Sequence, residues 1–411
     1  MVEKKVTIIH GNPDKKDEFG NPKILRVAAY CRVSTDTEDQ LKDISKNWQK
    51  NKKSDIISTK RDREGTTMNF NFFNEEKRLE KLSELGDSLE RLNQVVNWEQ
   101  FRPIIARALH KKAKGAGGRP AYDSVLMFKI LVLQRIYNLS DDQTEFQIND
   151  RMSFMRFLGL GLEDCVPDAK TIWLFRDKLT KVNAAKTLFD GFAAQLEAAH
   201  LITRTGTIVD ATFMDAPRQR NTRNENAAIK AGNIPEEWQQ EEQRNKLRQK
   251  DTDARWTKKG NELHYGYKNH VKADAESKLI INYVVTSANV HDSQVLPELV
   301  DDTDYALYAD SAYSGESIFA GLPDGLENCV LEKGNRNHPL TDEQKRCNKE
   351  KSRVRVRIEH IFGFMTNSMR GIIVRSIGKL RADFNAGLTS LVYNICRYEF
   401  LCRKHAYAVT G

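Results

Sequence analysis

Apolar residues recur at helical spacing through the first half of the chain. In "LEKLSELGDSLERLNQVV" the leucines lie three or four positions apart, as on one apolar helix face: Leu79, Leu82, Leu85, Leu89 and Leu92. The stretch "YDSVLMFKILVLQRIYNLS" is apolar on almost every side, which predicts a buried helix. Ser140 and Asp168 stand where two following helices need N-caps. We therefore expect an all-helical region over residues 68–200. A DNA-reading helical module and a plain bundle share this pattern.

The pattern changes to alternation after residue 200. "TGTIVDATFMDAP", residues 205–217, alternates and is β-branched at its centre, which predicts a strand. A polar, charge-dense insert follows at about 218–260, where we expect loop and helix. Further strands are predicted in "HYGYKNHVKAD", "KLIINYVVTSA" and "YALYAD", with helical "SQVLPELVDD" before the last. This order predicts an α/β domain with a central mixed sheet over residues 201–404.

Positive charge is concentrated in one predicted helix near the C-terminus. In "TDEQKRCNKEKSRVRVRIEHIFG", Thr341 and Asp342 can cap the helix, and lysines and arginines crowd the positions before Glu359. The whole chain of 411 residues carries a net charge of +8 and has a pI near 9.0. A basic total alone fits a solvated surface as well as a nucleic-acid partner. The local concentration favours contact with phosphate.

Composition narrows the class of protein. With 30% charged and 39% hydrophobic residues the chain is expected to be globular. It has neither an apolar run long enough to span a bilayer nor a readable signal peptide, so we expect no membrane partner and a cytoplasmic location, associated with the nucleoid when bound. The six cysteines show no paired metal spacing and are expected to be reduced thiols.

Three carboxylates lie next to apolar residues. Asp210 is inside a predicted strand, Asp310 ends another, and Glu359 follows the basic run. Burying an ionised carboxylate is costly unless something compensates it. Each alone is explained by a turn cap or an arginine pair. Together they favour chemistry, because three carboxylates holding two Mg²⁺ ions make a phosphoryl-transfer site.

Other acids and histidines nearby are expected to be structural. Asp215 is the closest rival of Asp210, whose flanks are more apolar. Asp274 is expected in a turn. His270 and His291 are expected to be satisfied within the fold rather than catalytic.

These blocks together resemble a known family. "TIVDATFMDAP", "TKKGNELHYGYKNHVKADAESKLI", "SANVHDSQVLPELV", "YADSAYSG" and "RVRIEHIFG" resemble DDE-type insertion-sequence transposases of the insertion-sequence-five branch, over about 68–403. The resemblance implies an RNase H-like fold, with Asp210, Asp310 and Glu359 as catalytic residues and as ligands of two Mg²⁺ or Mn²⁺ ions. It implies cleavage at the element's ends and strand transfer into target DNA by a homo-oligomer bound to those ends.

The family signature around the glutamate is incomplete. Arg355 matches its arginine, whereas Ser352 and Thr366 replace its tyrosine and lysine. Arg353, Arg355 and Arg357 are the expected DNA contacts, Arg355 first. Two alternatives are a catalytically inactive protein that binds DNA ends and a nuclease of the same fold.

A second resemblance covers the N-terminus. "RVAAYCRVSTDTEDQ", residues 26–40, resembles the first strand and nucleophile segment of serine recombinases, which implies Ser34 as the attacking hydroxyl and Arg32 as its neighbour. The likeness ends near residue 45. We expect residues 1–67 to be a truncated fragment and linker joined by gene fusion, with an inactive Ser34.

Overall fold

The computed structural model describes residues 73–109, 121–336, 338–371 and 373–410. The chain divides into two compact units, Met1–Phe70 and Asn71–Gly411, and every described element belongs to the second. Ser34 and Arg32 lie outside the described residues. Among the described helices, none combines the length and the apolar character that crossing a membrane requires.

Helices dominate the first part of the described unit. They are α2 (Phe73–Glu84), α3 (Ser88–Val95), η1 (Trp98–Phe101), α4 (Arg102–Leu109), α5 (Ser124–Tyr137), α6 (Asp141–Asp150), α7 (Met152–Leu158), α8 (Ala169–Lys181) and α9 (Ala184–Ala198). Helix α5 is buried on several sides, as its apolar sequence predicts. Ser140 caps α6 in a capping box with Gln143, and Asp168 caps α8, which confirms both predicted caps.

The prediction of a single apolar helix face over residues 79–92 is wrong in one respect. The structure divides this segment into α2 and α3 at Gly86, which takes φ +84°. Asp87 then starts α3 by accepting a hydrogen bond from the backbone N–H of Leu89. Leu85 is consequently 76% exposed instead of buried. Leucine spacing continues across the break, so periodicity alone could not reveal it.

A mixed sheet forms the second part. Strand β1 (Thr207–Asp215) pairs antiparallel with β3 (Glu262–Asp274), which pairs antiparallel with β4 (Ile280–Ser287). On the other side of β1, β5 (Ala306–Tyr308) runs parallel to it, and β6 (Glu327–Asn328) runs parallel to β5. Antiparallel strands on one side of β1 and parallel strands on the other are the arrangement of an RNase H-like sheet, as predicted.

The polar segment between β1 and β3 is partly different from the expectation. It contains α10 (Arg223–Lys230), α11 (Glu236–Gln239), η2 (Glu241–Gln243) and α12 (Arg244–Arg248). Glu225 joins these helices because it accepts from Trp238 Nε1 at 2.9 Å and pairs with Lys246 at 2.7 Å. Residues 255–259, expected in loop or helix, form strand β2 (Arg255–Lys259). This strand pairs with the start of β3, which satisfies its backbone despite its charged sequence.

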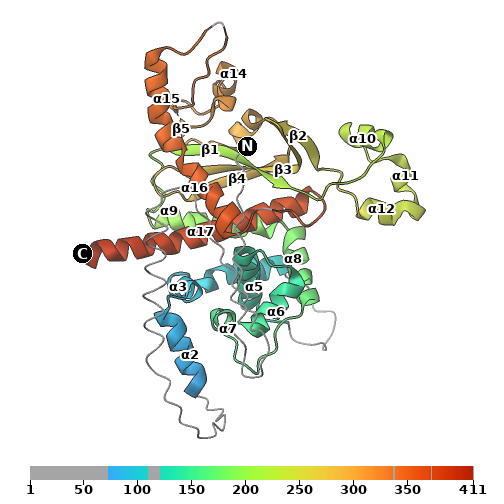
Figure 1. Cartoon of the computed structure of the whole chain (residues 1–411), viewed down its shortest axis with the longest axis vertical. Helices are drawn as coiled ribbons and strands as arrows, with labels where there is room; N and C mark the ends of the chain where they lie inside the picture. Colours follow the sequence, from blue (N-terminus) through green and yellow to red (C-terminus); the bar gives the residue numbers. More distant parts are fainter. Residues whose placement is uncertain (1–72, 110–120, 337, 372, 411) are drawn as a thin grey trace, which may run out of the picture. The chain divides into compact units, whose positions relative to one another are not determined.

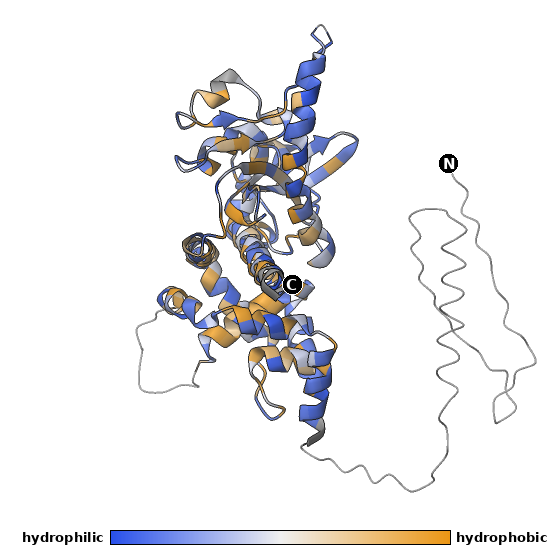
Figure 2. Cartoon of the chain, turned by 90° about the vertical axis from the view of Figure 1, so that its left-hand side faces the viewer, coloured by the Kyte–Doolittle hydropathy of each residue, from blue (hydrophilic) through white to orange (hydrophobic). Residues whose placement is uncertain are grey.

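Helices form the remaining described elements. They are η3 (Asp292–Val295), α13 (Leu296–Leu299), η4 (Ser311–Tyr313), α14 (Glu316–Phe319), α15 (Asp342–Arg355), α16 (Arg357–Gly363), η5 (Phe364–Ser368) and α17 (Lys379–Thr410). Thr341 caps α15 in a capping box, as predicted for this position. Helix α15 is hydrophilic along its length and buries none of its residues (Figure 2).

Helix α17 connects the helical part with the sheet. It crosses the unit between them (Figure 1) and packs on α9, α3 and α5 as well as on β4. Phe189 of α9 meets Tyr283 of β4 edge to face, with ring centroids 5.1 Å apart. One continuous hydrophobic core therefore runs from the helices into the sheet.

Candidate catalytic site

Asp210 and Asp310 come from neighbouring parallel strands. The β1–β5 register pairs Thr207 with Leu307 and Ile208 with Tyr308. Asp210 and Asp310 each lie two positions beyond the last residue that is paired between β1 and β5. Because neighbouring strands lie about 4.8 Å apart, this register brings the two backbones close together at the acids.

The position of Asp310 explains why a buried strand ends on a carboxylate. Asp310 is the N-cap of η4, and its side chain accepts from the backbone N–H of Ser311 at 2.6 Å. The preceding Ala309 is buried, whereas Asp310 itself is exposed. The chain thus leaves the core at this residue, and the carboxyl group still faces solvent.

Glu359 reaches the site on α16. Helix α15 ends at Arg355, and α16 begins two residues later. The Glu359 side chain is 53% exposed, whereas Ile358 and Ile361 on either side are buried and anchor the helix. Glu359 thus lies on the solvent side of a firmly packed helix.

Arg355 links two of the three acids. One of its guanidinium nitrogens lies 3.1 Å from Asp210 Oδ2, and the other lies 3.4 Å from Glu359 Oε1. Only 23% of the arginine side chain and 19% of the Asp210 side chain are exposed. Arg355 therefore balances the negative charge between strand β1 and helix α16.

The surroundings of Asp210 disfavour its ionised form. Burial raises its pKa to about 6, and the negative charge of Glu359 acts in the same direction. The hydrogen bond from the Ala211 N–H and the charges of Arg355 and Lys259 oppose this rise. Additional positive charge nearby would therefore stabilise the ionised form of the Asp210 carboxyl group.

Tyr313 is a buried tyrosine near several of the acids. Its ring is buried, and its hydroxyl has no hydrogen-bond partner among the described residues. Burial raises the pKa of Tyr313, and so do the negative charges of Asp292, Asp210 and Asp310. These carboxylates therefore act on the same phenol, although they come from distant parts of the sequence.

The acids are not assembled into a ligand set in this structure. Within the described ranges, no group of three or more His, Cys, Asp or Glu side chains is arranged to hold a metal ion. Arg355 bridges Asp210 and Glu359, so a cation already occupies part of the space that ligands would share. The charge that a bound ion would supply is supplied here by a guanidinium group.

The other two predicted arginines differ in their surroundings. Arg353 is exposed on α15. Arg357 is half-buried and donates to the backbone carbonyl of Ala275 at 2.7 Å, so its guanidinium group supports the fold. Thr366, at the signature's lysine position, is exposed and donates to the Phe362 carbonyl at 2.9 Å.

Asp274 and His291 take the structural positions expected of them, whereas His270 is satisfied at Nε2 only, because its Nδ1 has no hydrogen-bond partner among the described residues. Asp274 is fully buried and accepts from Ser277 N–H and Oγ–H at 2.7 Å in the turn after β3. His270 is fully buried against Thr286, and burial lowers its pKa to about 4. His291 accepts from the Ser293 N–H as the N-cap of η3.

Sequence reasoning missed a basic cleft beside Asp210. A small cavity of about 140 Å³ is lined by Ala211, Thr212, Phe213, Thr257, Lys258, Lys259, Lys268 and Asp292. Lys268 pairs with Asp292 at 2.8 Å, and the positive charge of Lys259 acts on Asp210. The one available signal was Lys268 in the buried alternation of β3, because a lysine there needs a partner.

Comparisons with protein families identify the class of protein. A family model described as "Transposase domain (DUF772)" matches residues 77–178, and one described as "Transposase DDE domain" matches residues 202–395. The two matches together span most of the described chain. The chain belongs to the DDE-type insertion-sequence transposases, as the sequence predicts. The resemblance of residues 26–40 to serine recombinases stays a prediction.

The fold is also similar to a solved structure. This structure is the cryo-EM structure of the piggyBac transposase synaptic complex with hairpin DNA. The match has a TM-score of 0.38 and 11% sequence identity, and it covers 80% of this chain and 75% of that chain.

Proposed function

We propose that this protein cleaves DNA at the ends of an insertion sequence and joins the freed 3′ ends to target DNA. The observation that carries the proposal is the contact of Arg355 with both Asp210 and Glu359, beside the β1–β5 pairing that leads to Asp310. In the proposed reaction, water attacks a phosphodiester at the element's end, and the freed 3′-OH then attacks the target. A homo-oligomer pairs the two ends.

The chemistry of the three side chains fits divalent cations. Members of this family generally use divalent metal ions. Asp210 is a buried carboxylate with a raised pKa, and Asp310 and Glu359 are exposed carboxylates with oxygens available. Carboxylate oxygens are the ligands that Mg²⁺ and Mn²⁺ prefer. When bound, such ions supply activation of the attacking oxygen and stabilisation of the leaving oxygen.

The chain's own residues hold and orient the DNA in this proposal. Arg355 exchanges its carboxylate partners for a backbone phosphate when DNA enters, because a guanidinium group binds phosphate in two-pronged geometry. Arg353 contacts phosphate from the exposed side of α15. Lys259 and Lys268 line the cleft beside Asp210 and contact phosphates of the same DNA strand.

Cleavage assays with single variants test the proposal. Asp210→Asn, Asp310→Asn and Glu359→Gln should each lower Mg²⁺-dependent cleavage of the DNA flanking the gene at least about a hundredfold. End binding should persist, because none of these changes removes a positive charge. Asp215→Asn is the matched control, since Asp215 is an exposed acid on the same strand. Cleavage that survives in the Asp210 and Glu359 variants contradicts the assigned site.

Pre-cut DNA separates the proposal from its alternatives. A transposase joins pre-cut ends to a target plasmid in the presence of Mg²⁺, whereas a nuclease of the same fold cuts without joining. A protein that only binds DNA ends does neither, and its binding is unchanged by Mg²⁺.

A further inference from the structure

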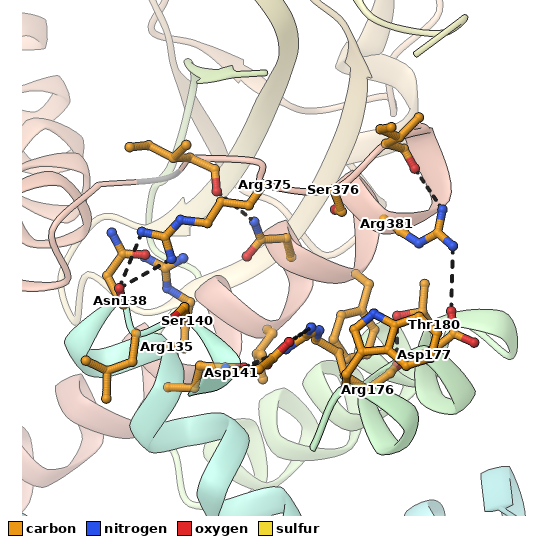
Figure 3. Close-up of a pocket in the computed structure, with 18 of the residues that line it drawn as sticks. Arg135, Asn138, Ser140, Asp141, Arg176, Asp177, Thr180, Arg375, Ser376 and Arg381 are labelled. Carbon is orange, nitrogen blue, oxygen red and sulfur yellow. Dashed lines mark hydrogen bonds and ion pairs between the residues drawn. The ribbon is translucent and has the colours of Figure 1, made fainter. Parts of the chain in front are cut away.

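A large pocket lies away from the three acids. It encloses about 500 Å³ and is lined by residues from α5, α6, α8, α12, α17 and the segment 373–377 (Figure 3). Single faces of two helices form much of its wall. Trp173, Arg176, Asp177 and Thr180 of α8 have helical spacing, and so have Arg381, Phe384, Asn385 and Leu388 of α17.

The pocket carries more positive than negative charge. Five arginines against two aspartates leave an excess of three positive charges among its lining residues. Asp141 is occupied by Arg176 at 2.6 Å, and Asp177 pairs with Lys181 at 2.6 Å and with Arg381 at 3.7 Å. Both carboxylates are therefore already paired with basic side chains.

Three arginines of the lining pair with no carboxylate among the described residues: Arg135, Arg248 and Arg375. Arg375 is exposed and makes only long contacts of 3.4 and 3.5 Å to the Asn138 carbonyl. Arg248 is exposed on α12. These two side chains can reach an incoming anion without breaking an ion pair.

Arg135 differs from the other two arginines because it is buried, with a relative exposure of only 6%. It donates to the carbonyls of Met369 and Gly371, and its Nε–H has no partner among the described residues. Burial lowers the pKa of Arg135 to about 10, and the positive charge of Arg375 adds to this effect. A buried cation that faces another cation is stabilised by an anion placed between them.

The pocket is tied to the strand that carries Asp210. Ile373 forms a bridge with Asp215 at the end of β1, and the Val374 N–H donates to the Asp215 carbonyl at 3.1 Å. Five residue steps along β1 lead from Asp210 to Asp215, which corresponds to about 17 Å. At about 3.4 Å per nucleotide along one strand, this length corresponds to roughly five nucleotides of DNA.

We propose that this pocket binds backbone phosphates of DNA about five nucleotides from the cleaved bond. This site rests on the proposed transposase function and adds a second anchor to it. Trp173 lines the pocket and is 44% exposed, so it offers apolar contact to the deoxyribose. The register of the cut would then depend on β1, because this strand connects anchor and acids.

Duplex-DNA binding by charge-matched variants tests the site. The probe is labelled duplex DNA from the region flanking the gene, and binding is measured by anisotropy without divalent cations. Arg375→Gln should weaken binding about three- to tenfold and reduce the slope of log K against log salt by about 1, because one phosphate contact is lost. Arg248→Gln with Arg375→Gln should reduce the slope by about 2.

The matched control is Lys178→Gln. Lys178 is exposed on α8 and does not line the pocket, and its replacement by glutamine removes the same charge as the arginine substitutions. It should leave the affinity and slope of the wild type nearly unchanged. Equal losses in the pocket variants and in Lys178→Gln would overturn the site in favour of general surface charge, and so would no loss in either.

Two further arms locate the phosphate and exclude a small anion. A neutral methylphosphonate placed four to six nucleotides from the mapped cut should weaken wild-type binding but add nothing to Arg375→Gln. Inorganic phosphate should compete only weakly with the duplex; tight phosphate binding with unaffected duplex binding would identify a small-anion site and overturn the proposal. Absence of duplex binding by the wild type would instead contradict the transposase function itself.

Discussion

The Asp210 carboxyl group lies in surroundings that disfavour its ionised form. It lies in β1 between buried Val209 and half-buried Ala211, and its surroundings raise its pKa to about 6. Arg355 provides the nearest compensating charge. In the absence of a further cation, ionised Asp210 therefore lowers the stability of the fold.

The stability of Asp210→Asn should reveal this cost. Because the folded pKa of about 6 exceeds the unfolded value of 3.8, Asp210 favours folding below about pH 4 and this contribution is lost as the pH rises through 6. In EDTA at pH 8, Asp210→Asn should be more stable than wild type by about 1 to 3 kcal/mol. The difference should vanish near pH 4. Chemical denaturation at both pH values checks this, and a destabilised variant at pH 8 would show that Arg355 overcompensates burial.

The sequence predicts three candidate acids, but it does not predict the contacts that they make in the structure. Asp210 and Asp310 each stood out as a carboxylate beside a run of apolar residues, which is a local signal. The Arg355 bridge depends on how α15 ends against β1, and no local pattern records that. Arg357 next to it was expected to contact DNA, yet its donation to Ala275 follows from the packing of α16 on the turn after β3.

Helix α17 determines how closely the helices approach the sheet. Gly387 faces β4, and a Cβ at this position would overlap the hydroxyl of Tyr283 and lie 3.1 Å from the Ala185 methyl group. The absence of a side chain thus allows three elements to meet. Sequence patterning alone could not show why a glycine lies within this apolar helix.

Gly387→Ala should therefore destabilise the protein by about 1 to 3 kcal/mol through overpacking. Gly363→Ala is the matched control. It also lies in a helix, but its Cβ would meet nothing within 4 Å, so the gain in helix propensity should stabilise the protein by about 0.5 to 1 kcal/mol. Thermal unfolding followed by circular dichroism measures both. Equal effects of the two substitutions would contradict the close approach of α17 to β4.

The helical part and the sheet share one core, although their sequences have different periodicities. The buried cluster includes Phe101 and Phe128 from the helices and Tyr267 and Val271 from the sheet. The change from helical spacing to alternation near residue 200 correctly located the change of structure. Periodicity does not report which elements pack together. The shared core could therefore be recognised only from the structure, and so could the arginine pocket formed by α5, α8 and segment 373–377.

A shared core predicts one cooperative unfolding transition for residues 71–411. Calorimetry should give a single peak whose calorimetric and van't Hoff enthalpies agree. Phe189→Ala removes the contact between α9 and Tyr283 and should lower the free energy of unfolding by roughly 3 to 5 kcal/mol. The whole peak should therefore move to lower temperature. Two separate peaks, only one of which moves in the variant, would show that the helical part and the sheet unfold independently.

At the scale of the whole molecule, the central claim is that Asp210, Asp310 and Glu359 together hold divalent cations once DNA is bound. Electron paramagnetic resonance of Mn²⁺ titrated into the DNA complex tests this claim most directly. The wild-type complex should bind about two ions per chain, and Asp210→Asn, Asp310→Asn and Glu359→Gln should each lose at least one, with Asp215→Asn unchanged. Equal Mn²⁺ binding by the wild type and all three variants would contradict the account.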